Sequence, residues 1–191
     1  MSTIQIKVPN WLDFLFAWPV LFYRERKFGQ PYRKIRLTEG KFTLVDQNDF
    51  YWLNNFDWFT KKNNKSFYAV RFDNDCAKWP TLVSMHRQIM DSPVGLLVDH
   101  RNLDGLDNRR DNLRIATYSE NNCNRLKKKN TSSRFVGVCW EKTKNRWVVH
   151  IRHNGKIIYL GLFKSETDAA HAYDAAARKY HGEFAHLNFS D

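Results

Sequence analysis

The sequence predicts an α+β fold made of two small domains. Short apolar runs alternate with turn residues over the first two thirds of the 191 residues, which predicts a mixture of short strands and helices. From residue 134 onward, three alternating segments precede one alanine-rich segment, the pattern of a small three-stranded antiparallel sheet packed on one helix. The run 126–133 is basic and almost without apolar residues. We therefore expect domains at 31–125 and 134–191, joined by this linker.

Residues 1–30 are expected to form an N-terminal arm rich in aromatic side chains. The apolar run from Trp11 to Tyr23 contains Asp13 and Pro19 and is shorter than the roughly 20 residues that a membrane span needs. The start of the chain has neither the basic segment nor the small-residue cleavage site of a secretory signal. We expect a short helix or extended arm packed on the next domain, and the basic residues that follow leave contact with a membrane surface open.

Residues 31–90 predict a lobe of β-hairpins and short helices. Strand-forming residues flank a turn at Glu39–Gly40, and Asp46 has the position of a helix start. The turn at 63–66 and the alternating residues after it predict a β-hairpin. The apolar spacing of 82–90 predicts a helix.

Residues 98–114, which read VDHRNLDGLDNRRDNLR, are where we expect the chemistry. The apolar run that ends at Asp99 predicts a strand, the polar residues after it a loop, and Asp111 the start of a short helix. These elements would bring Asp99, His100 and Asn112 together at one end. A carboxylate and an amide carbonyl suit Mg²⁺ or Mn²⁺ rather than Zn²⁺. A histidine beside them can take a proton from an attacking water.

This pattern, continued by NNCNR at 121–125, resembles the HNH (ββα-metal) nucleases of the phage and bacterial homing type. The resemblance implies a ββα-metal nuclease core preceded by a β-hairpin and helix lobe that guides the DNA. The family's usual turn has glycine where this chain has Leu103. The resemblance also implies roles for four residues: His100 as the general base, Asp99 and Asn112 as metal ligands, and Asn108 as the loop residue that holds the histidine.

The distribution of charge favours a polyanionic partner. The formal net charge is +11 and the isoelectric point is about 9.7. Residues 120–152 carry nine Lys and Arg against two Glu, so much of the charge is local, as in a nucleic-acid interface. A solvated basic linker would account equally well for the lysines at 127–129.

The C-terminal domain predicts strands at 134–141, 146–153 and 156–163, and then a helix that begins at Ser165. Because side chains alternate along a strand, Trp147, Val149 and Ile151 of the middle strand would face the helix. Its basic residues would face outward, where a sheet can enter the major groove of DNA.

Residues Ser133 to Phe189 are similar to the Apetala/ethylene-response-factor DNA-binding domain of plants. The similarity lies in F-V-G-V, R-W, I-R, Y-L-G-x-F, A-A-x-A-Y-D-A-A-A and the closing L-N-F, and it implies this fold and duplex DNA as partner. The plant domains typically have Arg at the positions of Val136 and Cys139, so their base preference does not carry over. We expect DNA contacts from Arg134, Arg146, His150, Arg152 and Tyr159, and from Lys127, Lys128 and Lys129 of the linker.

These patterns together predict a metal-dependent, site-recognising DNA endonuclease of the homing type, which acts on double-stranded DNA without a small-molecule cofactor. A non-catalytic DNA-binding regulator with a decayed nuclease lobe is the main alternative, and an RNA-binding or membrane-surface protein is a further one. The three cysteines lack C-x-x-C spacing and predict neither a disulfide framework nor structural zinc. We expect an intracellular protein of the cytoplasm or nucleoid, not secreted, and favour a monomer.

Overall fold

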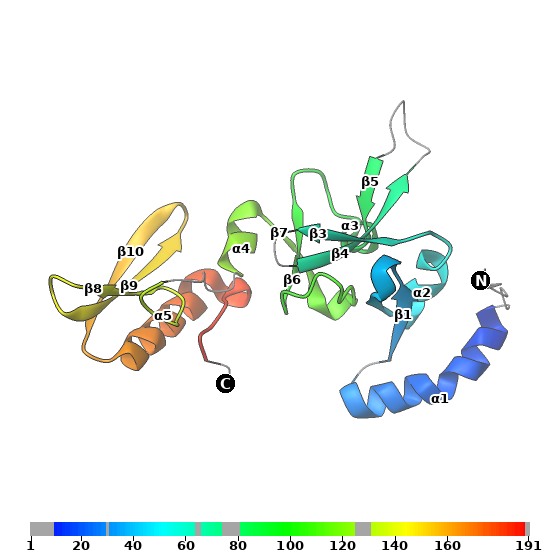
Figure 1. The fold of residues 1–191 in the computed structure, drawn as a ribbon, viewed down its shortest axis with the longest axis horizontal. Coiled ribbons are helices and arrows are strands. Elements are labelled where there is room, and N and C mark those ends of the chain that lie inside the picture. Colours follow the sequence, from blue (N-terminus) through cyan, green and yellow to red (C-terminus); the bar gives the residue numbers. More distant parts are fainter. Residues whose placement is uncertain (1–9, 30, 64–65, 74–80, 125–130, 190–191) are drawn as a thin grey trace. The chain divides into compact units, whose positions relative to one another are not determined.

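The computed structural model describes residues 10–29, 31–63, 66–73, 81–124 and 131–189 (Figure 1). It confirms the α+β class, since helices and small antiparallel sheets alternate along the chain. The chain forms two compact units, one of Met1–Ser92 with Asp104–Arg114, the other of Pro93–Leu103 with Ile115–Asp191. Within the described ranges, no helix has the length and apolar character required to cross a membrane.

The first unit contains helix α1, Asn10–Phe28, which is longer than the apolar run Trp11–Tyr23 for which the sequence predicts a short helix or an extended arm. Strands β1 (Tyr32–Arg36) and β2 (Phe42–Asp46) pair antiparallel around the one-turn helix η1 (Thr38–Gly40), and helix α2 (Gln47–Leu53) follows. The arm packs on this lobe as expected. Asp13 pairs with Arg33 at 2.9 Å, and Arg24 donates to the Tyr32 carbonyl at 2.6 Å.

A three-stranded sheet completes this unit. Strands β3 (Phe59–Asn63) and β4 (Ser66–Asp73) form the predicted hairpin, and β5 (Thr81–Ser84) pairs with the other edge of β4. Helix α3 is confined to Met85–Met90. The prediction of a helix from 82 onward was therefore wrong over its first turn. Residues 82–84 satisfy their backbone groups on β4 instead, a partner that helical periodicity does not reveal.

The central motif folds as two strands followed by a helix. Strands β6 (Leu97–His100) and β7 (Leu113–Ala116) are hydrogen-bonded neighbours; the one-turn helix η2 (Arg110–Asn112) precedes β7, and helix α4 (Tyr118–Cys123) follows it. The short helix predicted directly after Asp111 was wrong, because the chain is extended there. The helix starts later, where Thr117 and Glu120 form a reciprocal capping box.

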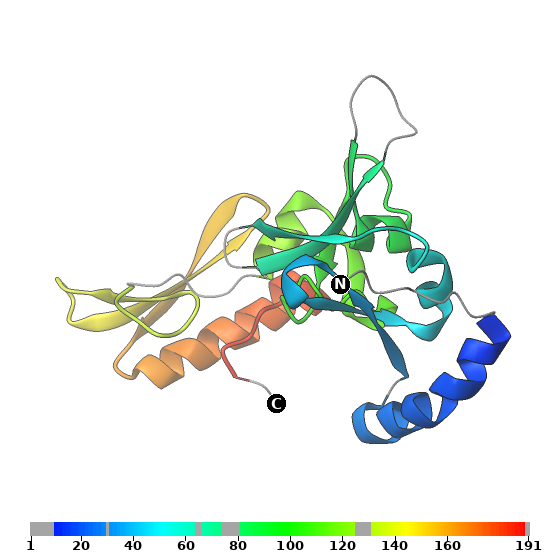
Figure 2. The same cartoon turned by 45° about the vertical axis from the view of Figure 1, so that its right-hand side comes forward.

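The C-terminal sheet has the strand order β10-β9-β8, with β8 at Val138–Glu141, β9 at Arg146–His153 and β10 at Lys156–Phe163. Helix α5 (Glu166–His181) lies along one face of it, as Figure 2 shows, and η3 (Gly182–Phe184) follows. The helix contributes small side chains and one ring to a core that also holds Phe135, Val138, Val149 and Ile151. This confirms that the alanine-rich segment forms a helix packed on the sheet.

The first strand of this sheet is shorter than predicted, because residues 134–137 bend away before β8 begins. Gly137 has a φ of +74°, and a Cβ at this position would overlap the Tyr173 ring. Only glycine combines this backbone conformation with so close an approach. The bend therefore depends on one residue.

Candidate active site and DNA-binding face

Asp99 and His100 end strand β6, and both side chains are buried, each 5% exposed. The chain then turns sharply, since the backbone N–H of Leu103 donates to the His100 carbonyl at 2.9 Å. Leu103 has a φ of +64°, the left-handed conformation that glycine adopts most readily. The leucine thus takes the backbone conformation that favours glycine, the residue usual at this turn in the HNH family.

Asn124, the residue directly after α4, contacts this strand end. Its side-chain nitrogen lies 3.2 and 3.0 Å from the two carboxylate oxygens of Asp99, and 3.0 Å from the carbonyl oxygen of His100. Asn124 is itself buried. We did not name it as a site residue from the sequence, although it lies in the NNCNR segment that contributed to the resemblance. A residue-level signal was missing, because four asparagines fall within 121–130.

Asn108 and Asn112 lie in the first unit, where they hold a loop in place. The Asn108 amide donates to the hydroxyl of Thr43 at 2.7 Å, and its backbone N–H donates to the Leu44 carbonyl at 2.8 Å. The Asn112 amide donates to the Asp107 carbonyl at 2.8 Å. Both asparagines are buried. The loop between strands β6 and β7 is therefore hydrogen-bonded to strand β2.

Two motif arginines make ion pairs that stabilise the same loop. Arg109 binds the Asp107 carboxylate with two hydrogen bonds of 2.7 Å, and Arg110 binds Asp49 at 2.7 and 2.8 Å. These hydrogen bonds raise the pKa of both arginines. Asp46 accepts the Arg110 backbone N–H at 2.8 Å, and burial nevertheless raises the pKa of its carboxyl. These arginines have structural partners within the protein.

The structure thus places the predicted catalytic residues in two groups. Asp99 and His100 belong to the second unit, together with α4 and Asn124, whereas Asn108 and Asn112 belong to the first unit. Within the first group, the Asn124 amide binds the Asp99 carboxylate and the backbone carbonyl of His100 at the end of one strand.

The outward face of the C-terminal sheet has the predicted alternation. Val149 and Ile151 are buried at 0% and 2% exposure, whereas the neighbouring His150 and Arg152 are exposed. Tyr159 pairs with His150 across β9 and β10, their ring centroids 5.6 Å apart. Arg146 is half-buried, and Arg134 is exposed with its guanidinium 4.8 Å from the Phe135 ring centroid. Lys127, Lys128 and Lys129 lie outside the described residues.

Two family models match the chain, one for HNH endonucleases over residues 91–123 and one for the AP2 domain over residues 133–183. The chain combines an HNH endonuclease domain with an AP2 domain. The nuclease match contains Asp99, His100, Asn108 and Asn112, and the AP2 match contains the sheet and helix α5.

Individual relatives include one HNH endonuclease that matches most of the chain and plant proteins that match about a third of it. An uncharacterized HNH endonuclease of Acanthamoeba polyphaga mimivirus is 28% identical over 155 residues, which are 80% of this chain and 78% of the viral protein. A dehydration-responsive element-binding protein of Oryza sativa is 41% identical over 64 residues, 32% of this chain. An AP2-like ethylene-responsive transcription factor of Arabidopsis thaliana is 45% identical over 58 residues, 30% of this chain. The matched regions span 23% and 12% of the plant proteins. No solved structure matches.

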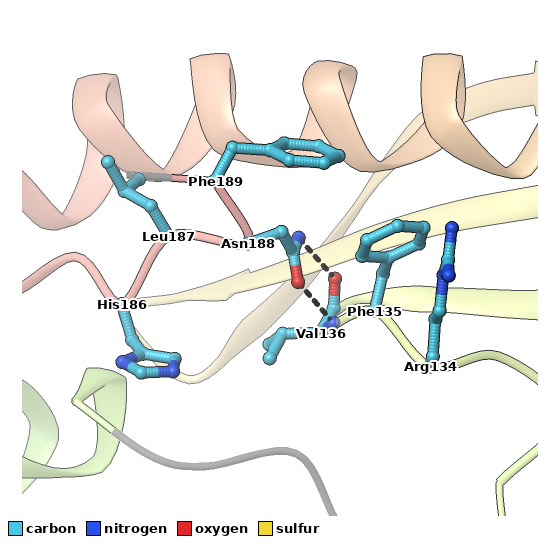
Figure 3. Close-up of a pocket in the computed structure, with 7 residues that line it drawn as sticks. All are labelled: Arg134, Phe135, Val136, His186, Leu187, Asn188 and Phe189. Atoms are coloured by element: carbon cyan, nitrogen blue, oxygen red, sulfur yellow. Dashed lines mark hydrogen bonds between the residues drawn. The ribbon is translucent and has the colours of Figure 1, made fainter. Parts of the chain in front are cut away.

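The AP2 domain extends past its family match, because the segment after η3 is tied back to the core (Figure 3). The Asn188 side chain accepts from the Val136 N–H at 2.6 Å and donates to the Val136 carbonyl at 3.2 Å. The buried carboxylate of Asp174 accepts the backbone N–H groups of Asn188 and Phe189 at 2.9 to 3.1 Å. The closing Leu187–Asn188–Phe189 is thus a structural clamp.

Proposed function

We propose that this protein is a metal-dependent, site-recognising DNA endonuclease of the homing type. The HNH domain (31–125) would hydrolyse a phosphodiester bond and the AP2 domain (134–191) would select the site on duplex DNA, with 126–133 as the linker. The observation that carries this proposal is the end of β6, where Asp99 and His100 are consecutive buried residues, in a chain whose C-terminal sheet also carries Arg146, His150 and Arg152 on one face. The succession β6, β7, α4 supports a ββα arrangement.

In this mechanism His100 is the general base and takes a proton from the attacking water. Asp99 and Asn112 would hold Mg²⁺ or Mn²⁺, and Asn108 keeps the loop in place. The donor set suits such an ion: each oxygen of a carboxylate has two lone pairs, so the Asn124 amide can occupy one on each and leave others for a cation. A bound ion supplies stabilisation of the charge on the phosphate and the leaving 3′ oxygen.

The competing hypothesis is a DNA-binding regulator whose nuclease lobe has decayed. The four motif positions, Asp99, His100, Asn108 and Asn112, are all occupied by the residues that the mechanism requires, which favours an active enzyme. Incubation of the purified protein with supercoiled plasmid, in Mg²⁺ or in chelator, separates the two hypotheses. A regulator would bind the plasmid without nicking it in either buffer.

His100→Ala should lower the cleavage rate by roughly 10²- to 10⁴-fold, since that is the usual contribution of a general base. Asn102→Ala, an exposed neighbour in the following turn, is the matched control and should cleave like wild type. Single-turnover cleavage of the supercoiled plasmid measures both rates. An unchanged rate in His100→Ala would remove His100 from the mechanism.

A further inference from the structure

The Asn124 side chain is surrounded by oxygen atoms. Its nitrogen has both Asp99 carboxylate oxygens and the His100 carbonyl within 3.2 Å, and the Arg101 carbonyl at 3.4 Å. All of these atoms are hydrogen-bond acceptors, so only the NH₂ end of the amide can face them. The two N–H groups are shared among them, which fixes the plane of the carboxylate as well as its position.

We infer that Asn124 is a positioning residue of the nuclease site: it orients the Asp99 carboxylate toward the divalent ion and holds the backbone that carries His100. This inference rests on the proposed function. Asn124 follows directly on α4, so the amide also connects the strand end to the end of that helix. Partners that hydrogen-bond to a metal-binding side chain typically change metal affinity or activity by about 10- to 100-fold when they are removed.

The test uses the full chain without DNA. Asn124→Leu keeps the number and branching of the non-hydrogen side-chain atoms and removes both donors, and Ser119→Ala, on the exposed side of α4, is the control. Titration with Mn²⁺, followed by the electron paramagnetic resonance of the free ion, should show affinity weakened by about 10-fold or more in Asn124→Leu only. Plasmid cleavage should then require a correspondingly higher Mg²⁺ concentration.

A folded Asn124→Leu with wild-type Mn²⁺ affinity would overturn the inference and leave the proposed nuclease intact. A wild-type chain that binds no Mn²⁺ would overturn both. Should Asn124→Leu fail to fold, Asn124→Gln keeps the donor but displaces it by one methylene group. Gln is then expected to weaken Mn²⁺ binding, and unchanged affinity in that variant would contradict the positioning role.

The outward face of the AP2 sheet carries mainly apolar and aromatic side chains. The strand register places outward side chains in rows, and one row crosses all three strands: Cys139 pairs with Val148, and Val148 pairs with Leu162. This row is apolar. Cys139 and Leu162 are exposed, the latter by 37%. The next rows pair Tyr159 with His150 and Ile157 with Arg152, so apolar and aromatic groups occupy most of the face.

We infer that this face recognises thymine-containing duplex sites through the thymine C5-methyl group in the major groove. This inference rests on the proposed DNA binding. In the major groove, Arg and Lys hydrogen-bond to guanine, whereas apolar side chains contact the thymine methyl group. The middle of this face offers apolar side chains. Arg146 and Arg152 on the same strand, with Lys142, Lys144 and Lys156 at its ends, supply the charge that complements the phosphates.

A binding selection from random duplexes, with the full chain in chelator, gives the preferred site. Replacing its thymines one at a time by deoxyuridine removes a methyl group and leaves the hydrogen bonds unchanged. We expect about four-fold weaker binding for each contacted methyl. Leu162→Asn, which keeps the number and branching of the non-hydrogen side-chain atoms, should reduce this thymine-to-uracil ratio toward one, whereas Thr143→Ala in the exposed turn should preserve it.

Equal affinity for thymine and deoxyuridine duplexes would refute methyl recognition without affecting the claim of DNA binding. A preferred site that consists of G·C pairs alone would refute it as well. Failure to select any duplex would refute DNA binding by the AP2 domain and, with it, this inference.

Discussion

At the scale of single residues, two positions of the chain require an unusual backbone conformation or a close backbone contact. Leu103 accepts a left-handed backbone after His100, and Gly137 allows the backbone to touch the ring of Tyr173. Neither requirement is a property of the residue alone. At Leu103 the requirement arises from the local turn that follows His100, and at Gly137 it arises because the Tyr173 ring occupies the neighbouring space.

Gly137→Ala should unfold or strongly destabilise the AP2 domain, because its Cβ would overlap the Tyr173 ring. We expect a loss of about 1–3 kcal/mol beyond the backbone cost. Gly155→Ala is the matched control, since Gly155 has nearly the same φ, +75° against +74°, and open space around its Cβ position. Urea denaturation followed by circular dichroism compares the two. Equal losses would mean that backbone conformation, not crowding, decides the effect.

The raised pKa of Tyr173 predicts how the stability of the AP2 domain changes with pH. Burial, and secondarily the neighbouring Cys123 and Asp174, raise the pKa of this phenol from 10.0 to about 12. A pKa that is raised in the folded state gives stability that is complete below pH 10 and is lost as the pH rises toward 12. The loss should reach about 2–3 kcal/mol. Tyr173→Phe should be less sensitive to pH over this window in urea denaturation, and identical slopes would contradict the assignment.

At the scale of elements, the AP2 domain is closed by a segment that has no regular structure of its own. The clamp works because one buried carboxylate on α5 satisfies backbone N–H groups that would otherwise lack partners. The nuclease loop is closed in a comparable way, by Thr43 and Leu44 of β2. Irregular segments here are positioned by specific hydrogen bonds to regular ones.

Asp174→Ala and Asn188→Ala should each destabilise the AP2 domain, and together by less than the sum of the two. The reason is that both changes break the same bonds, so a double-mutant cycle should give a coupling energy of about 0.5–3 kcal/mol. His171→Ala, which loses a ring contact with Phe189, is the control for loss of packing at this end. Additive effects of the Asp174 and Asn188 changes would exclude a shared clamp.

At the scale of the whole molecule, cutting and binding should be separable, because the proposed metal ligand lies in the segment that matches HNH endonucleases and the basic residues of the sheet lie in the segment that matches AP2 domains. Asp99→Ala should abolish cleavage and leave DNA affinity nearly unchanged, since phosphate contacts provide most of the affinity. Gel shifts over a range of salt concentrations, beside a cleavage assay, measure both quantities. Equal loss of binding would make Asp99 a structural residue.

The order and pairing of the strands and the helix of the AP2 domain could be predicted almost completely from its sequence. Strand alternation, an Asn-Gly turn and an alanine-rich helix are all local patterns. Both residues of that turn, Asn154 and Gly155, have the positive φ that such a hairpin needs. The nuclease half was predicted less well. Residues 82–84 and 113–116 are strands where helices were expected, because partners distant in sequence determine short elements of four residues.

The sequence by itself determined the order of the HNH and AP2 segments, the residue types that the proposed chemistry would use and the basic residues of the sheet, since these follow from composition and short-range spacing. Only the tertiary structure decided that Asn124 holds Asp99, that Asn108 bonds to Thr43, and that Asp174 binds the closing segment. These contacts join residues 14 to 65 positions apart. Spacing within one element cannot specify such pairs, because they depend on how buried polar groups find partners when the elements pack.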